Sequence, residues 1–180
     1  MNDWKETLFC WKGLLKRKGN PAILTWKGTW VGNEEASTLP SKDDFQASVN
    51  TFELESSPVE LGPEVEKEDL DLGMLRASSL VGKELSWKGQ YKLDNGCGLE
   101  DYSDESHICR FTEIKVKGRG KGGEIGEEGG EVIVAKASGD TEFGKFVSYG
   151  VLEDVGEGKV QLTLCRRYVS DDDPRYATLK

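Results

Sequence analysis

Apolar and polar residues alternate along several stretches of this chain. From Leu85 to Leu93 the odd positions are apolar or glycine, and the even positions are polar. From Ala22 to Trp30 the even positions are apolar or glycine, with Thr25, Lys27 and Thr29 between them. Successive side chains of a β-strand point to opposite faces, so each stretch is predicted to be a strand with one buried and one wet face.

The tripeptide Trp-Lys-Gly occurs three times within such stretches, at 11–13, 26–28 and 87–89. In each copy the lysine falls on the polar face and the tryptophan on the apolar face. Glycine on the apolar face of a strand lets a sheet bend or another backbone approach closely. The repeats therefore favour a strongly coiled sheet.

The same patterning predicts eight strands, separated mostly by clusters of turn-forming residues. Within the third of them the apolar face changes phase at Asn50, which predicts a β-bulge there. The predicted strands are Leu8–Leu15, Ala22–Val31, Phe45–Leu54, Glu84–Leu93, His107–Val116, Glu131–Ala137, Lys145–Leu152 and Lys159–Val169.

Two segments lack the alternation. Pro63–Leu72 opens with proline and is rich in acids, which suits either a short helix or a loop. Lys117–Gly130 is rich in glycine and is predicted to be an irregular connection between two strands. We therefore expect one all-β domain over residues 1–180, with insertions at 55–82 and 117–130.

About eight antiparallel strands with one apolar face each must curl into a barrel or stack as two layers. The glycines inside strands favour the barrel, and a two-layer β-sandwich is the alternative.

Two short motifs resemble those of a known group of barrels. Gly28-Thr29-Trp30 resembles the G-x-W signature of the calycins, which include the lipocalins and the fatty-acid-binding proteins. Arg166-Arg167-Tyr168, in the last predicted strand, is similar to the Arg-x-Tyr with which several fatty-acid-binding proteins hold a carboxylate. The resemblance implies a calycin-like barrel with a ligand in its interior.

Charge and cysteine content narrow the function classes. A net charge of −9 argues against an electrostatic grip on nucleic acid or an anionic membrane. No secretory signal and no apolar run long enough for a membrane span is visible, so a cytoplasmic protein is expected. The four cysteines are too scattered for a zinc site, and we expect reduced thiols rather than disulfides.

Arg166 and Tyr168 carry the most distinctive chemistry. Parity places Arg166 on the apolar face of its strand, with Val160, Leu162 and Leu164. A buried guanidinium needs a negative partner. That partner is either a ligand carboxylate or phosphate, with Tyr168 donating a further hydrogen bond, or a structural acid such as Glu53 or Glu113.

Four aromatic residues, Trp26, Trp30, Trp87 and Tyr91, share the apolar faces of two predicted strands. They either pack as core or line an apolar cavity. Together with Arg166 and Tyr168 they are the candidate ligand-binding residues.

Other candidate sites match their motifs poorly. The glycine-rich stretch 118–123 lacks the ending and the helix of a phosphate-binding loop. The acids between Asp94 and Glu105 depart from the calcium-binding spacing and are expected to be solvated in a turn. His107 and Cys109 share a face, but nothing in the sequence activates the thiol.

We therefore expect a non-catalytic binding module that holds a small amphipathic anion inside the barrel, without metal or cofactor. One alternative is a scaffold or accessory subunit with a filled interior, which engages another protein through Pro58–Leu80 and Lys117–Gly130. A weaker alternative is an enzyme that uses His107 and Cys109.

Overall fold

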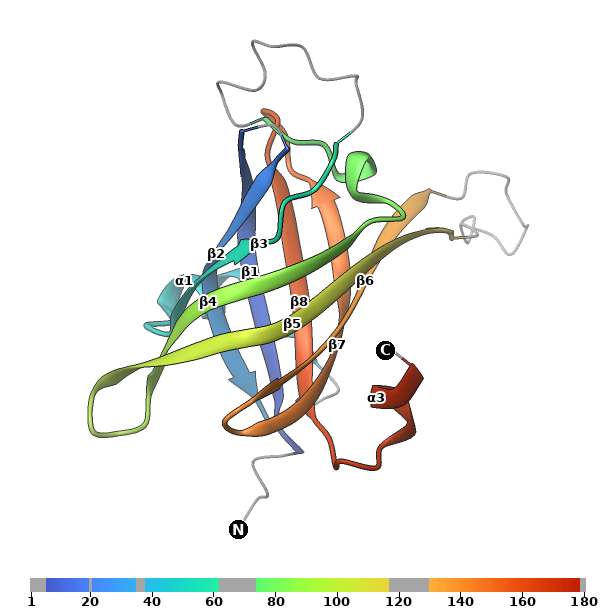
Figure 1. Cartoon of the computed structure of the whole chain (residues 1–180). Helices are drawn as coiled ribbons and strands as arrows, with labels where there is room; N and C mark the ends of the chain where they lie inside the picture. Colours follow the sequence, from blue (N-terminus) through green and yellow to red (C-terminus); the bar gives the residue numbers. More distant parts are fainter. Residues whose placement is uncertain (1–5, 20, 35–37, 62–73, 117–129, 179–180) are drawn as a thin grey trace, which may run out of the picture.

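A computed structural model of the chain shows a closed barrel of eight antiparallel strands (Figure 1). It describes residues 6–19, 21–34, 38–61, 74–116 and 130–178. The strands are β1 (Leu8–Lys18), β2 (Ile23–Asn33), β3 (Thr51–Ser56), β4 (Glu84–Asp94), β5 (Leu99–Lys115), β6 (Glu131–Thr141), β7 (Gly144–Asp154) and β8 (Val160–Tyr168). The helical elements are α1 (Lys42–Ala47), the 3-10 helix η2 (Ala77–Leu80) and α3 (Pro174–Thr178).

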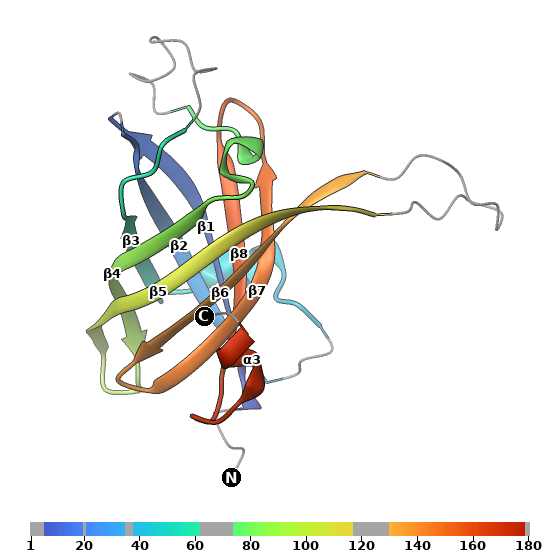
Figure 2. The ribbon, with the colours of Figure 1, turned by 45° about the vertical axis from the view of Figure 1, so that its right-hand side comes forward.

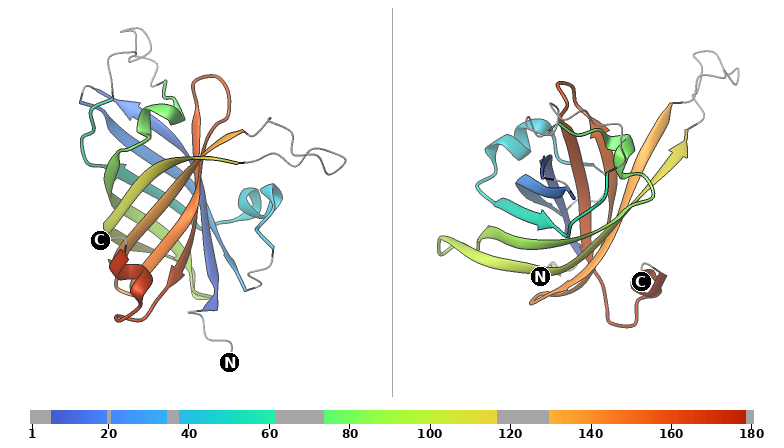
Figure 3. Two further views of the ribbon diagram at one scale, coloured as in Figure 1. Left: turned by 90° about the vertical axis from the view of Figure 1, so that its right-hand side faces the viewer. Right: turned by 45° about the horizontal axis from the view of Figure 1, so that its top comes forward.

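Each strand pairs with the next along the chain, and β1 pairs with β8 to close the sheet. β1 and β8 lie side by side in the barrel wall, which Figures 2 and 3 show from further directions. The expected all-β class and the barrel are thereby confirmed, and the sandwich alternative is wrong. α1 and α3 lie outside the barrel wall (Figure 3).

The Trp-Lys-Gly repeats mark points where neighbouring strands come very close. Gly13 and Gly28 lie directly opposite each other in β1 and β2. A Cβ atom at Gly28 would lie 2.0 Å from the carbonyl oxygen of Lys12, and one at Gly89 would lie 2.1 Å from that of Glu53. Only glycine fits such contacts, so the repeats allow the tight coiling that closes a small barrel.

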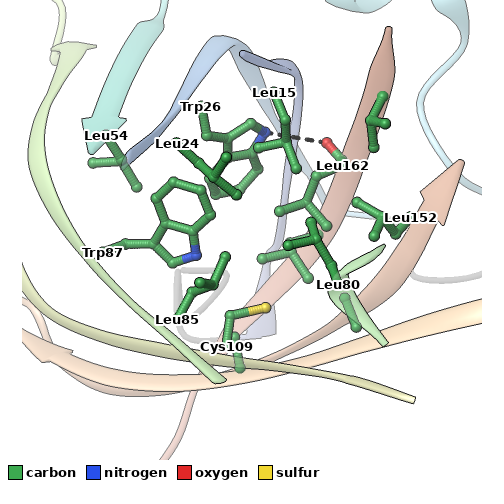
Figure 4. Packing of buried hydrophobic residues seen from close by; sticks show 14 of the residues in the cluster. Leu15, Leu24, Trp26, Leu54, Leu80, Leu85, Trp87, Cys109, Leu152 and Leu162 are labelled. Carbon is green, nitrogen blue, oxygen red and sulfur yellow. Dashed lines mark hydrogen bonds between the residues drawn. The ribbon is translucent and has the colours of Figure 1, made fainter. Parts of the chain in front are cut away.

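One half of the barrel is filled by side chains. Trp26 and Trp87 are fully buried there among leucines from several strands (Figure 4). The indole of Trp26 donates a hydrogen bond to the carbonyl oxygen of Leu162. Leu75, Ala77 and Leu80, on and before η2, are buried in the same cluster and cover this end of the barrel.

The predicted strand Phe45–Leu54 is wrong in its first half. Residues Lys42–Ala47 form helix α1, whose Ser41 and Asp44 make a reciprocal capping box. Strand β3 begins only at Thr51. The change of phase at Asn50 therefore marks the approach from a helix to a strand, and not a bulge.

The strand predicted from His107 is too short, because β5 begins at Leu99. Pro63–Leu72, and Lys117–Gly130 except for Gly130 itself, lie outside the described residues. The scaffold alternative, which depends largely on these segments, stays a prediction.

Candidate functional site

A cavity of about 380 Å³ occupies the end of the barrel opposite η2. Its lining comes from the start of β1, the ends of β2, β4 and β8, and the turn between β6 and β7, which lie in the lower part of Figure 1. The lining residues are Phe9, Trp11, Trp30, Tyr91, Leu93, Phe143, Arg166 and Tyr168. Apart from Arg166, these side chains are aromatic or aliphatic. The cavity is therefore an apolar chamber with one cation in its wall.

Arg166 is held in place from three sides. Its side chain is 2% exposed, and its Nη2 donates to Oδ2 of Asp104 at 2.7 Å. The guanidinium carbon lies 3.6 Å from the ring centre of Phe146 and 4.5 Å from that of Trp11. Stacking on two aromatic faces and a charge-assisted hydrogen bond fix its orientation.

Asp104 reaches the barrel interior through an irregularity in β5. The pairing of β4 and β5 shifts register between Trp87 and Gly89. Trp87 is paired with His107 and Gly89 with Asp104, so two positions along β4 correspond to three along β5. Both Asp104 and His107 are buried, although a regular strand would turn residues three apart to opposite faces. The bulge thus brings a carboxylate and an imidazole to one face.

The three groups form a buried cluster that carries one positive and one negative charge. His107 Nδ1 lies 3.3 Å from Oδ2 of Asp104 and 3.4 Å from Nη2 of Arg166. Because an ionised carboxylate only accepts hydrogen bonds, the contact with Asp104 suits an Nδ1–H that donates to Oδ2. Burial and the charge of Arg166 together lower the pKa of His107 although Asp104 raises it, so the imidazole is neutral at pH 7.

The same cluster determines the charge of the other two groups. Burial alone would raise the pKa of Asp104, but Arg166 and His107 outweigh burial and hold it below its usual value. Burial opposes the charge of Arg166, yet Asp104 and Tyr168 together raise its pKa. Asp104 is therefore ionised and Arg166 protonated.

Four buried polar atoms on residues that line the cavity lack a hydrogen-bond partner among the described residues. They are Nε and Nη1 of Arg166, Nε1 of Trp11 and the hydroxyl of Tyr91. All four can donate a hydrogen bond. Buried donors are normally paired, so the lining is suited to a ligand that brings acceptor oxygens.

The structure brings four of the six candidate site residues to this cavity: Arg166, Tyr168, Trp30 and Tyr91. Trp26 and Trp87 do not line it. Their indoles lie 5.9 Å apart in the packed half of the barrel. Trp11 lines the cavity and contacts both Trp26 and Trp30, so the aromatic side chains continue from one half to the other.

The structural partner of Arg166 was not among the acids expected. Glu53 lies on the outer surface with Lys27, and Glu113 is exposed. Asp104, expected in a solvated turn, is the partner instead. The bulge in β5 gives no signal in the alternation, which is why the expectation failed.

Phe9 and Trp11 were missed, although the alternation of Phe9, Trp11, Gly13 and Leu15 places both on the inner face. Leu93 has the same signal in β4. Phe143 lies in the turn after β6, where the strand pattern carries no information.

The two residues of the enzyme alternative lie on the inner face of β5, in buried surroundings. Burial raises the pKa of the Cys109 thiol, which disfavours the thiolate that a nucleophile requires. Nε2 of His107 has no partner among the described residues, but His107 is not one of the residues that line the cavity.

No group of three or more histidine, cysteine or acidic side chains within the described ranges could hold a metal ion. In the acidic β4–β5 turn, which was compared with a calcium-binding loop, polar side chains bond within the turn. Asp94 accepts a hydrogen bond from the Gly96 amide, and Asn95 donates to Glu100. No helix in the described part of the chain is long and apolar enough to span a membrane.

No family model, curated protein or solved structure matches this chain. The resemblance to the calycins through Gly28-Thr29-Trp30 and Arg166-Arg167-Tyr168 therefore stays an expectation from the sequence, while the closed barrel is a finding of the structure.

Proposed function

We propose that this barrel is a binding module that holds a small amphipathic anion in the cavity at its open end. The observation that carries the proposal is the placement of Arg166: a fully buried guanidinium in the wall of an apolar cavity, with two nitrogen atoms still without an acceptor. Burying a cation in an apolar chamber is costly, and a filled core would not require it.

The head group of the ligand is expected to be a carboxylate. Asp104 accepts from Nη2 of Arg166 and Tyr168 also interacts with the guanidinium, while Nε and Nη1 have no hydrogen-bond partner among the described residues. Trp11 Nε1 and the Tyr91 hydroxyl are two further buried donors, both neutral, on residues of the same lining. A carboxylate offers two oxygens with about four acceptor positions, which matches a lining that only needs acceptors.

The rest of the ligand is expected to be apolar and short. Phe9, Trp30, Leu93 and Phe143 present hydrocarbon to the cavity. A volume of about 380 Å³ holds about a dozen non-hydrogen atoms, at the roughly 30 Å³ that one water molecule occupies in the liquid. Medium-chain carboxylates such as decanoate have this size and this division into polar head and apolar tail.

Tryptophan fluorescence tests the proposal directly, because Trp11 and Trp30 line the cavity. Titration with decanoate is expected to change the emission with saturation, and decanol, which has the same chain but no charge, is expected to bind more weakly. If neither decanoate nor any compound of a broad panel of lipophilic anions changes the emission, the proposal is wrong.

Arg166→Ala identifies the site within the protein. Removing a charged hydrogen-bonding group is expected to weaken binding by about 1.5–3 kcal/mol, or roughly 10- to 150-fold. Arg167→Ala is the matched control, because Arg167 is the next residue of β8 and pairs with Glu6 outside the barrel. It should leave the affinity unchanged.

Arg166→Ala leaves Asp104 unpaired and can impair folding. The double variant Arg166→Met, Asp104→Asn removes both charges, so no unpaired charge is left in the interior. Loss of decanoate binding in this folded double variant supports the proposal, and wild-type affinity contradicts it.

A further inference from the structure

The seam of the barrel, where the first and last strands meet, contains two cysteines. Cys10 of β1 lies directly opposite Cys165 of β8, although 155 residues separate them in sequence. Their Sγ atoms lie 2.7 Å apart, and both thiols are free. β1 and β8 run side by side along their shared edge (Figure 3).

Both cysteines point away from the cavity. Trp11 and Arg166, the next residue after each, line the cavity, so Cys10 and Cys165 lie on the outer face of the same two strands. They differ in access: Cys10 is 1% exposed, while Cys165 is partly exposed. The pair therefore lies on the outer side of the part of the cavity wall that Trp11 and Arg166 form.

The backbone geometry at this position suits a disulfide. Directly opposed residues of an antiparallel pair have Cα atoms about 4.5–5.5 Å apart. Disulfides span Cα separations of roughly 4.4–6.8 Å. The other two cysteines have no such partner: Cys109 lies opposite Leu85 and Ala137, and Cys97 is exposed in the turn after β4.

We propose that Cys10 and Cys165 form a redox-active pair, which a small-molecule disulfide of the oxidised-glutathione type converts to a disulfide across the barrel seam. The thiolate of Cys165 attacks one sulfur of the oxidant, which forms a mixed disulfide and releases one thiolate of the reagent. Cys10, after losing its proton, attacks Sγ of Cys165 and releases the second. Two protein thiols are oxidised to one disulfide, and one reagent disulfide is reduced to two thiols.

The surroundings assign the two roles. Cys165 is the more accessible, and the hydrogen bond from Cys10 lowers the pKa of its thiol. The same contact, with burial, raises the pKa of Cys10. The attacking group of an exchange reaction must be an accessible thiolate, and the resolving group must lie next to the mixed disulfide.

The disulfide would change the stability of the barrel. It would link covalently the two strands that close the sheet, β1 and β8, which carry Trp11 and Arg166. It would also close a loop of nearly the whole chain, which favours a large stabilisation in the chain-entropy account. The melting temperature of the oxidised protein is expected to rise by about 5–15 °C for a protein of this size.

The test uses the full chain with Cys97→Ser, which removes the exposed thiol. The reduced protein is incubated with oxidised glutathione and analysed by intact mass, thiol titration and peptide mapping without reductant. We expect the loss of two thiols, a Cys10–Cys165 linked peptide, and a higher melting temperature that dithiothreitol reverses. Thiols that all stay free, or a mixed disulfide on Cys165 that never resolves, would overturn the proposal.

Two further variants separate the roles. Cys10→Ser should stop at the mixed disulfide on Cys165, and Cys165→Ser should leave Cys10 unmodified. Glutathione on Cys10 in the second variant would contradict the assignment of Cys165 as the attacking thiol. None of these measurements requires a ligand in the cavity, so the redox pair and the anion site are tested separately.

Discussion

Replacing Asp104 by asparagine tests whether the barrel contains a true buried ion pair. The substitution keeps the size of the side chain and removes the charge that faces Arg166 at 2.7 Å. Because both side chains are almost completely buried, the guanidinium would be left in an apolar interior without a counter-charge.

Two routes give a similar magnitude for this loss. Two unit charges about 4 Å apart attract by roughly 4 kcal/mol at an effective dielectric constant of about 20. Removal of one partner from a buried ion pair costs about 3–5 kcal/mol. For a protein of this length, that corresponds to a fall in melting temperature of roughly 6–20 °C.

The assay is urea unfolding followed by tryptophan fluorescence. Asp101→Asn is the matched control, since Asp101 lies on the same strand and pairs with Lys92 at 2.9 Å, but its side chain is 58% exposed. That control should cost less than about 1 kcal/mol. The double variant Asp104→Asn, Arg166→Met should recover much of the lost stability, because no unpaired charge remains.

The reasoning is refuted if Asp104→Asn costs no more than Asp101→Asn. Arg166 would then not depend on Asp104, and its role in the cavity would need another explanation.

Two further outcomes follow from the interior of the barrel. Burial lowers the pKa of His107 from its usual 6.5. Below that pH the imidazole therefore binds a proton in the unfolded chain more readily than in the folded protein. Stability should therefore fall as the pH drops below about 6.5 in urea titrations, and His107→Gln should flatten that slope; an unchanged slope would show that the imidazole is not held neutral. Gly28→Ala should cost about 1–3 kcal/mol in thermal unfolding, because its Cβ would meet the carbonyl of Lys12 at 2.0 Å. Gly130→Ala, where the added Cβ meets nothing within 4 Å, should have little effect, and equal losses would discount the close approach.

Local alternation predicted much of the wall of the barrel. The period of two assigned Arg166 to the inner face together with Leu162 and Leu164, and β8 has that pattern of burial. It also placed Tyr91 and Trp87 on one face of β4. This works because the direction of a side chain in a strand depends on its neighbours along the chain.

Alternation could not distinguish the two halves of the interior. Trp26 and Trp30 share a face of β2, yet Trp30 lines the cavity and Trp26 is packed against Trp87. Their depth depends on the stagger of strands around the closed sheet and on where η2 covers the end, and both are properties of the whole barrel.

The sequence by itself determined the class of the fold and the inner faces of most strands, because these follow from the side-chain period of two. Only the tertiary structure decided which groups meet. Asp104 reaches Arg166 because a bulge reverses the phase of β5, and Cys10 meets Cys165 because the first and last strands close the sheet. Such contacts depend on register between distant segments, which loops, bulges and closure set together and which no short stretch of sequence contains.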